Sequence, residues 1–344
     1  MTPLLIDADQ DAFWTATAGH RFGSLFSSPP WQRAVAGTYG FAISAAVGAG
    51  GPSGAALLYA RVADLRGERI VCGPFCDYCD PLAEDVAMWR ELIEPVLALR
   101  LPVTLRCLRN DAPLHDEARF DTAGRAAWHG VDLTRPEAAL WDGFEGSARQ
   151  NIRKAIRLGL SVREGRDLDD VRVFFDMHCA VRKTRYRLLP QPFALFANLH
   201  AAFAAEERIV VLLAEDAGRP VAGILFLVWG DTLYYKFNAS TDRQGCPNDL
   251  LMWEGIRLGQ RLGLRLMDLG ASDHAQPGLL RYKAKFATTQ AEITRLRWTP
   301  PGHADPRGEE AGRLLSRITD LFTAPGVPDE ITRAAGEALY AQFC

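Results

Sequence analysis

Hydrophobic and polar positions repeat along the chain at two different spacings. Continuous or alternating apolar runs, such as residues 209–214 and 221–228, predict buried or half-buried strands. Apolar residues at helical offsets, such as Leu251, Leu258 and Leu262, predict amphipathic helices. In each half of the chain, these patterns predict helices, then an antiparallel set of strands, and then a helix followed by a strand. The expected fold class is therefore α/β (α+β), built from two similar units in tandem.

In the first half, the pattern predicts three helices and five strands. Helices are expected at residues 9–18, from 31 onward and at 85–99, and strands at 41–47, 55–62, 68–72, 103–108 and 128–131. Pro95 is expected to kink or divide the third helix, because proline lacks the amide donor that a helix interior needs. Residues 111–125 are expected to form a loop and a short helix.

In the second half, the pattern predicts four helices and six strands before a helical tail. Helices are expected at 147–158, at 169–185, in a segment ending near 204 and at 248–262, and strands at 161–164, 209–214, 221–228, 232–238, 265–269 and 293–298. Ser147 and Asn248 are types that cap helix starts, and Gly159 and Gly263 stand where a left-handed residue ends a helix. We expect a first domain at 1–146, a second at 147–304 that carries the catalytic motif, and the tail at 305–344.

The composition is that of an ordinary globular protein. The chain has 344 residues, of which 48% are hydrophobic and 24% charged, and this excludes a mainly disordered, collagenous or coiled-coil protein. No apolar run approaches the ~20 residues that span a bilayer. The N-terminal stretch has neither the basic start nor the apolar core of a secretory signal. We therefore expect a cytoplasmic protein without a membrane span.

Charge is distributed unevenly along the chain. The formal net charge is −3, yet residues 147–188 contain 11 basic and 5 acidic residues. A basic segment in a weakly acidic protein is typical of a site for an anionic ligand, although a solvated helix face is an alternative. Within this segment, Arg149, Arg153 and Arg157 are spaced four apart and predict one basic stripe on a helix.

Three cysteines, Cys72, Cys76 and Cys79, have a CxxxCxxC spacing. Radical S-adenosylmethionine enzymes bind an iron–sulfur cluster through thiolates at this spacing, so such an enzyme is a remote alternative. Against it, the sequence after Cys79 lacks regular strand–helix repeats and a convincing glycine-rich loop. No fourth zinc ligand is evident nearby, and we expect these cysteines to bind no metal.

Four stretches carry a resemblance to a known family: SPPW at 28–31, PFCDY at 74–78, SARQNIRKAIRLGL at 147–160 and DLGASD through GLLRYK at 268–283. They are similar to motifs of the FemAB-like family of aminoacyl-tRNA-dependent aminoacyltransferases, whose members combine two GNAT-like (acyl-CoA N-acyltransferase-like) domains. The last two stretches are the specific ones. The chain departs from the family in having Tyr282 where Phe is usual, and in lacking the long helical arm of some members.

The resemblance implies an acyltransferase that forms an amide bond. An aminoacyl group would pass from aminoacyl-tRNA to an amine acceptor, which would be a peptidoglycan precursor or the amine of a small peptide or natural product. No cofactor is expected apart from the donor co-substrate, and no DNA partner. The alternative donor is an acyl-CoA, but the turn at 243–248 has only part of the R/Q-x-x-G-x-G/A pattern that binds pyrophosphate at a helix start.

The resemblance also implies candidate catalytic residues. Lys283 ends the closing motif and would stabilise the developing negative charge of the transition state; an exposed surface lysine beside Lys285 is the alternative. We expect Lys283→Ala to lose turnover because of this role, and to keep the melting temperature because an exposed lysine contributes little to stability. Lys285→Ala is the control and should stay active. Asp273 and His274 are candidate bases for the acceptor ammonium, and an Asx turn is the alternative for Asp273.

Further residues are candidates for substrate binding. The basic cluster at a predicted helix end, with Arg182, Arg185 and Tyr186, would help to bind the acceptor's phosphates, although the helix dipole alone favours cations there. The Arg149, Arg153 and Arg157 stripe would contact the tRNA. The remaining candidates for substrate binding are Trp31, Arg33, Tyr78, Tyr235, Asn238, Arg281 and Tyr282.

Overall fold

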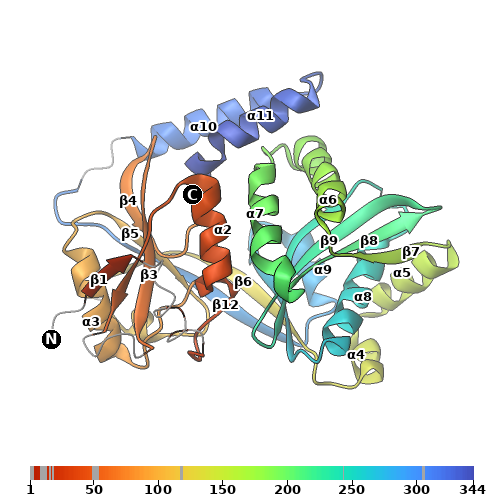
Figure 1. Ribbon diagram of the computed structural model, residues 1–344, viewed down its shortest axis with the longest axis horizontal. Helices are drawn as coiled ribbons and strands as arrows, with labels where there is room; N and C mark the ends of the chain where they lie inside the picture. The colour runs from red at the N-terminus through yellow and green to blue at the C-terminus, as the bar shows by residue number, and fades with distance from the viewer. Residues whose placement is uncertain are drawn as a thin grey trace. The chain divides into compact units, whose positions relative to one another are not determined.

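The computed structural model describes residues 4–7, 14, 17, 19–48, 54–116, 119–242, 244–303 and 307–344. The chain divides into two compact units, shown in Figure 1. Unit 1 comprises Met1–Ala126, Glu292–Arg317 and Ala341–Cys344, and unit 2 comprises Ala127–Ala291 and Ile318–Tyr340. The division thus falls 20 residues before the expected boundary at 146/147, and the expected tail is shared between the units, because strands and a helix pass from one unit into the other.

Unit 1 is a sheet with helices packed on it. Its strand order is β1-β2-β3-β4-β5-β12, and its pairs are antiparallel except β4 with β5. The strands are β1 (Leu4–Asp7), β2 (Ile43–Val47), β3 (Ala56–Asp64), β4 (Gly67–Val71), β5 (Val103–Cys107) and β12 (Thr289–Trp298). The helices are η1 (Leu25–Ser27), α2 (Pro29–Tyr39), α3 (Val86–Leu97) and η2 (Ala112–His115).

The helix α3 supplies much of the unit 1 core. Asp85 caps it by accepting a hydrogen bond from the Met88 amide, and Trp89, Ile93 and Val96 are fully buried on one face. Pro95 does not divide the helix, because α3 is one helix that ends two residues later. In the last turn, the missing amide hydrogen of Pro95 removes only one hydrogen bond of the helix.

The loop between β4 and α3 is fixed by a buried carboxylate. Asp80 is 3% exposed and accepts hydrogen bonds from the amides of Leu108, Arg109 and Asn110, at 2.8 to 3.2 Å. Burial raises the pKa of Asp80 to about 6, against the opposing effect of these amides. Asp80 therefore ties the cysteine-containing loop to the end of β5.

Replacing Asp80 by Ala should destabilise unit 1 strongly. Three buried amide donors would lose their acceptor, and at about 1–3 kcal/mol for each unsatisfied group the loss should reach about 3 kcal/mol or more. Asp111→Ala is the matched control, because this side chain is 82% exposed and should change stability by no more than about 0.5 kcal/mol. Denaturant unfolding measures both. Equal stability of the two variants would contradict the structural role of Asp80.

Unit 2 contains six strands, which are ordered β6-β11-β10-β9-β8-β7 in the sheet. Its strands are β6 (Asp121–Asp132), β7 (Ser161–Gly165), β8 (Ile209–Asp216), β9 (Arg219–Trp229), β10 (Thr232–Ser240) and β11 (Leu266–Asp273). Its helices are α4 (Glu137–Gly143), α5 (Gly146–Arg157), α6 (Leu168–Val181), the π-helix η3 (Arg182–Tyr186), α7 (Phe193–Phe203), η4 (Ala204–Glu206), α8 (Pro247–Arg261), α9 (Pro277–Ala284) and α11 (Asp329–Leu339). The helix α10 (Gly308–Phe322) and the short η5 (Tyr340–Phe343) cross the division between units.

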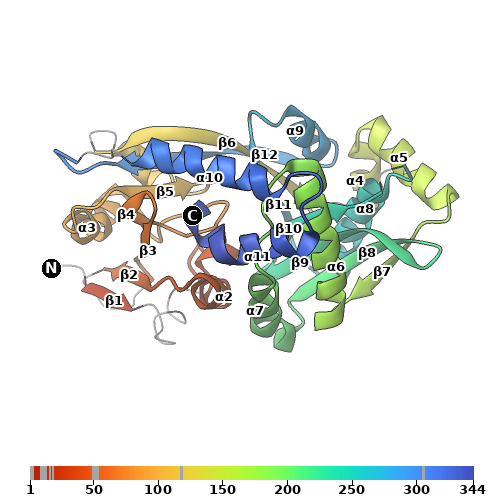
Figure 2. The same cartoon turned by 90° about the horizontal axis from the view of Figure 1, so that it is seen from above.

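Helices cover both faces of the unit 2 sheet. Figure 2 shows α6 and α7 on one face and α5 and α8 on the other. The core on the α5–α8 side is formed by Ile152 and Ala155 of α5, Leu251 of α8 and Phe226 of β9, among others. This packing places the starts of α5 and α8 close together, and the candidate site is built there.

Most expected elements are present, and the differences have local causes. The strand pattern missed β1 and predicted only residues 128–131 of the long β6, whose first residues were expected to belong to a loop and a short helix. The short helices α4 and α9 were also missed, and eight or fewer residues are too few to show a helical repeat. Apart from Trp14 and Thr17, the expected helix at 9–18 lies outside the described residues. Among the described residues, no helix is both long and apolar enough to cross a bilayer.

Candidate active site

The parallel strands β10 and β11 separate after a short paired stretch. Their register covers only Thr232–Tyr234 against Leu266–Asp268, although both strands continue well beyond it. On its other edge, β10 has a register shift against β9 between Tyr235 and Phe237. Bulges are common beside active sites, because they redirect side chains and end pairing. We call this point, where β10 leaves β11, the fork.

Lys283 lies on the β11 side of the fork. Its Nζ donates hydrogen bonds to the carbonyl oxygens of Gly270, at 3.1 Å, and Ala271, at 2.8 Å. Gly270 has φ +71°, a left-handed conformation that only glycine adopts without strain. The closing motif thus contains both partners of this contact, since it begins near Gly270 and ends at Lys283.

The expectation that Lys283 is exposed is wrong. The residue is 3% exposed, because α9 turns its side chain inward onto β11, while Lys285 at the end of α9 is half-buried. Beside it, burial and the Lys283 charge lower the pKa of His129. Asp268, at the last paired position, accepts hydrogen bonds from Trp128 Nε1 and from the Gly270 amide, at 2.8 and 2.6 Å. Lys283 is therefore part of a buried polar cluster that shapes the fork.

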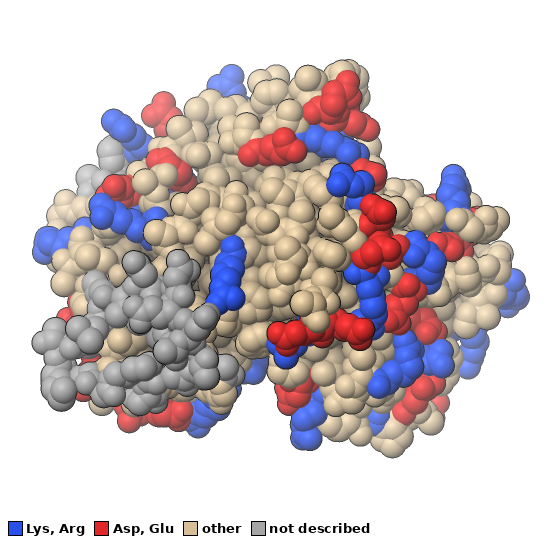
Figure 3. All heavy atoms as spheres, in the orientation of Figure 1, with Lys and Arg blue, Asp and Glu red and all other residues tan. Residues whose placement is uncertain are grey.

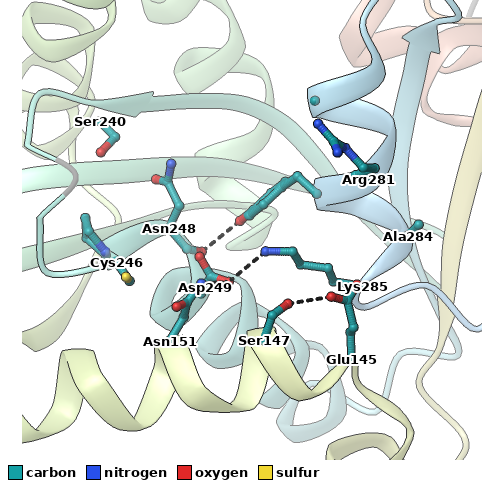
Figure 4. Close-up of a pocket in the computed structure, with 13 residues that line it drawn as sticks. Glu145, Ser147, Asn151, Ser240, Cys246, Asn248, Asp249, Arg281, Ala284 and Lys285 are labelled. Carbon is teal, nitrogen blue, oxygen red and sulfur yellow. Dashed lines mark hydrogen bonds and ion pairs between the residues drawn. The ribbon is translucent and has the colours of Figure 1, made fainter.

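A cavity of about 630 Å³ lies among the starts of α5 and α8 and the helix α9. Figure 4 shows side chains from all three helices converging on it. It is lined by residues that include Ser147 and Asn151 from α5, Asn248 and Asp249 from α8, and Arg281, Tyr282 and Lys285 from α9 and its end. Glu145 also lines it, and its Oε1 accepts a hydrogen bond from Ser147 Oγ at 2.7 Å.

Asp249 is the most unusual charged group of this cavity. It is 7% exposed, and its Oδ1 accepts a hydrogen bond from Asn151 Nδ2 at 3.2 Å and lies 4.0 Å from Lys285 Nζ. Burial raises the pKa of Asp249, and the contacts with Asn151 and Lys285 oppose this shift. A buried carboxylate with a shifted pKa in a cavity marks a candidate functional group.

Four of the predicted substrate-binding residues line this cavity or lie beside it. Tyr282 donates from its hydroxyl to the Asn248 carbonyl at 2.9 Å, and Asn238 Nδ2 donates to the Asn248 side-chain oxygen at 3.2 Å. Tyr235 lies close enough to Tyr282 to contribute to the raised pKa of that phenol, whose main cause is burial. Arg281 lines the cavity and is exposed.

The candidate bases lie on the loop between β11 and α9. Asp273 is exposed, and its Oδ1 accepts a hydrogen bond from the Ala275 amide at 2.8 Å. This is the Asx turn that was considered as its alternative role. His274 is exposed on the same loop. Neither residue lines the cavity described above.

The basic cluster after α6 has mixed roles. The guanidinium of Arg182 donates to the Leu189 carbonyl at 2.7 and 3.0 Å, so it holds the following loop in place. Arg185 stacks on Tyr186, which is 49% exposed. The Tyr186 phenol acts with burial to raise the pKa of Tyr235, so this turn lies near β10 beyond the fork. Its π-helix and the positive φ of Arg187 are features often found at functional sites.

The predicted tRNA stripe is only partly available on α5. Arg149 donates hydrogen bonds to the carbonyl oxygens of Trp141 and Asp142, and so caps the C-terminal end of α4. Arg153 lies over the Trp141 ring, and Arg153 and Arg157 are exposed. The helix begins at Gly146 rather than with Ser147 as cap, and α8 begins at Pro247 rather than with Asn248 as cap. Gly159 and Gly263 have the expected positive φ.

Two predicted substrate-binding residues of unit 1 have structural roles instead. Trp31 and Tyr78 are 1% and 0% exposed, and each makes an edge contact with the Phe26 ring. Trp31 Nε1 also donates to Cys76 Sγ at 3.2 Å. Both side chains belong to the core because the flanking SPPW and PFCDY stretches pack on each other. Arg33 is exposed on α2 and remains a candidate.

The three clustered cysteines are also packed in this core. Cys72, Cys76 and Cys79 are buried, and burial raises the pKa of Cys72 to about 12. A Cβ at Gly73 would lie 2.5 Å from the Cys79 Cβ, so the loop is closely packed at this point. Within the described part of the chain, no cluster of His, Cys, Asp or Glu side chains is arranged to hold a metal ion.

Comparison with known proteins identifies a family match for the part of the chain that contains the fork and the cavity. Residues 146–284 match the family model of the acetyltransferase (GNAT) domain. The crystal structure of FemX superposes with a TM-score of 0.66 at 13% identity, covering 91% of this chain and 100% of FemX. Residues 146–284 therefore match a GNAT domain, and the chain shares the fold of FemX. No curated protein matches it in sequence.

Two further solved structures share the fold of this chain. A conserved protein of unknown function from Bacteroides thetaiotaomicron has a TM-score of 0.56 at 15% identity, covering 87% of this chain and 100% of its own. The C-terminal domain of a putative lysylphosphatidylglycerol synthetase from Agrobacterium fabrum has a TM-score of 0.53 at 12% identity, covering 92% and 98%. The matches confirm the fold expected from the sequence, and the GNAT domain identifies an acyltransferase.

Sequence reasoning missed Asp249 and the acidic and amide groups around it. Asp249 follows Pro247 and Asn248 at a helix start, where an acidic residue is explained by the helix dipole alone. The α5 motif did identify the correct helix, but its polar residues Ser147 and Asn151 face the cavity. A buried position for Asp249 was the missing information, and only the packing of α5 on α8 supplies it.

Replacing Lys283 by Met should reduce both stability and turnover. The Gly270 and Ala271 carbonyls would lose a donor, so unfolding should become easier by about 2 kcal/mol. Loss of a positive charge at the transition state should lower the rate by about 10²–10³. Calorimetry and transfer assays, run where both proteins are folded, separate the two effects. Lys285 lines the cavity and no longer serves as a control.

Two results would contradict this assignment. An unchanged melting temperature in Lys283→Met would show that the two carbonyls do not need this donor. Full turnover of the folded variant would remove Lys283 from the chemistry.

Proposed function

We propose that the protein transfers an aminoacyl group from aminoacyl-tRNA to an amine acceptor. The single observation that carries this proposal is the start of α8, where acyl-CoA proteins with the R/Q-x-x-G-x-G/A turn bind pyrophosphate. Here Pro247 occupies the first helical position and has no amide hydrogen. The buried carboxylate of Asp249 lies two residues later. A phosphate dianion at this point would meet a negative charge and one donor fewer.

The surface along α5 supports a nucleic-acid donor. A second cavity, of about 580 Å³, adjoins the end of α5 at Lys154 and Leu158, and Pro247 lines both this cavity and the first. Arg153 and Arg157 are exposed on the same helix. Figure 3 shows acidic and basic side chains interspersed on the visible face of unit 2, rather than a broad basic field. The tRNA contact would therefore be small and concentrated on α5.

The reaction would take place beside the fork between β10 and β11. The acceptor amine attacks the carbonyl carbon of the aminoacyl ester, a C–N bond forms, and the ester C–O bond breaks. The leaving ribose oxygen takes a proton, and the amine loses one to a base, for which Asp273 and His274 remain candidates. The backbone of β10 and β11 beyond the fork, together with Lys283, would stabilise the oxyanion.

A donor comparison tests the proposal directly. Purified protein is incubated with a pool of charged tRNAs or with a set of acyl-CoAs, each with a mixed amine pool, and products are identified by mass. Transfer from charged tRNA, lost when the tRNA is deacylated beforehand, is the expected result. Transfer from acyl-CoA alone would contradict the proposal and favour the acyl-CoA-dependent N-acyltransferase that the GNAT family model describes.

The α5 arginines give a second prediction. The double variant Arg153→Ala/Arg157→Ala should weaken tRNA binding and reduce the slope of log affinity against log salt by about 1.5, because each phosphate contact contributes about 0.7–0.9. The matched control is Arg265→Ala/Arg313→Ala, which removes two arginines that are 71% and 73% exposed and line neither of the two cavities. An unchanged salt slope in the α5 variant would place the tRNA elsewhere.

A further inference from the structure

We propose that the cavity at the start of α8 binds the α-ammonium group of the donor's aminoacyl residue, and that Asp249 is the residue that recognises it. This inference rests on the proposed aminoacyl-tRNA donor and adds a chemical requirement, namely a free, positively charged amine on the transferred group. Donors with a blocked or missing α-amine would then be rejected at this cavity.

The charges that line the cavity match a ligand that carries both signs. Glu145 and Asp249 are acidic, and Arg281 and Lys285 are basic. A ligand whose only charge is a phosphate would be repelled by the acidic pair, Glu145 and Asp249. A ligand whose only charge is an ammonium group would be repelled by the basic pair, Arg281 and Lys285. An aminoacyl-nucleotide has an ammonium group and a phosphodiester on one molecule, so it can engage both pairs.

The environment of Asp249 is not explained by its place on the helix. An acidic side chain in the first turn usually stabilises a helix from an exposed position. Asp249 is 7% exposed, and burying a carboxylate without close pairing is unfavourable. The ammonium of Lys285 lies 4.0 Å from Asp249 Oδ1, which is the outer limit of an ion pair. The side-chain contacts of Asp249 with Asn151 and Lys285 both involve Oδ1.

The raised pKa of Asp249 also shows that its ionised form is disfavoured in this environment. Burial raises it, so the folded protein binds this proton more tightly than the unfolded chain does. The resulting stability is present at low pH and is lost as the pH rises through the folded pKa. When Asp249 is ionised, its carboxylate has Lys285 Nζ only at 4.0 Å as a counter-charge. A bound ammonium group would supply another and favour the ionised form.

The test measures binding with Asp249→Asn. The ligands are non-hydrolysable 3′-aminoacylamino-3′-deoxyadenosine 5′-phosphates with a range of side chains, each also prepared with its α-amine acetylated. The wild-type protein should bind the best free-amine ligand at least about tenfold more tightly than its acetylated form, a difference of about 1.4 kcal/mol. In Asp249→Asn this preference should fall below about threefold.

A control on the same helix separates local charge from net charge. Glu254→Gln removes one negative charge from α8 at a residue that pairs with Arg257 at 3.0 Å, and it should keep the preference for the free amine. Thermal melting should show Asp249→Asn to be at least as stable as the wild-type protein, because the variant cannot place a negative charge at this buried position. Both variants can therefore be compared as folded proteins.

The outcomes distinguish this inference from the proposed function. Equal binding of free and acetylated ligands by the wild-type protein, or an unchanged preference in Asp249→Asn, would overturn the ammonium site and leave the tRNA donor in place. Binding of acetyl-CoA, with no binding of any of the nucleotides, would overturn the donor proposal and this inference together.

Discussion

The separation of β10 from β11 is the constraint on which the rest of the site depends. Two parallel strands that pair over only three residues leave backbone groups beyond that point without a ladder partner, and such groups must be satisfied in another way when buried. Lys283 does this for Gly270 and Ala271. The same lysine thus keeps the fork in shape and brings a positive charge to the place where we propose that the acyl group reacts.

The groups at the start of α8 determine which acyl donor can bind beside the fork. A helix start is ordinarily favourable for anions, but here a proline and a buried carboxylate occupy the positions at which a phosphate would bind. The helices α5 and α9 add amide, hydroxyl and charged groups around the same space. Residues 146–284 match the GNAT acetyltransferase domain, and the charges at this helix start are the reason why we propose a donor other than acyl-CoA.

The order of elements could be predicted from the sequence, because strands such as β8 and β9 and helices such as α8 have clear periodicity. The motif near Gly270 and Lys283 could also be recognised, and the structure shows its two ends in contact. What could not be predicted was the burial of polar and amphipathic residues. Trp31 and Tyr78 were expected to bind substrate but lie in the core, whereas Asp249 was not among the predicted site residues but lines the cavity. Burial depends on which elements pack together, and spacing along the chain does not contain that information.

The most direct measurement is a crystal structure with a non-hydrolysable aminoacyl-adenosine phosphate bound. The account predicts the carbonyl of the aminoacyl group beside β10 and β11 beyond the fork, on the side where Lys283 contacts Gly270 and Ala271, and the α-ammonium group within hydrogen-bond distance of Asp249. A nucleotide bound away from both positions, or a coenzyme A complex with its pyrophosphate on the amides at the start of α8, would contradict it.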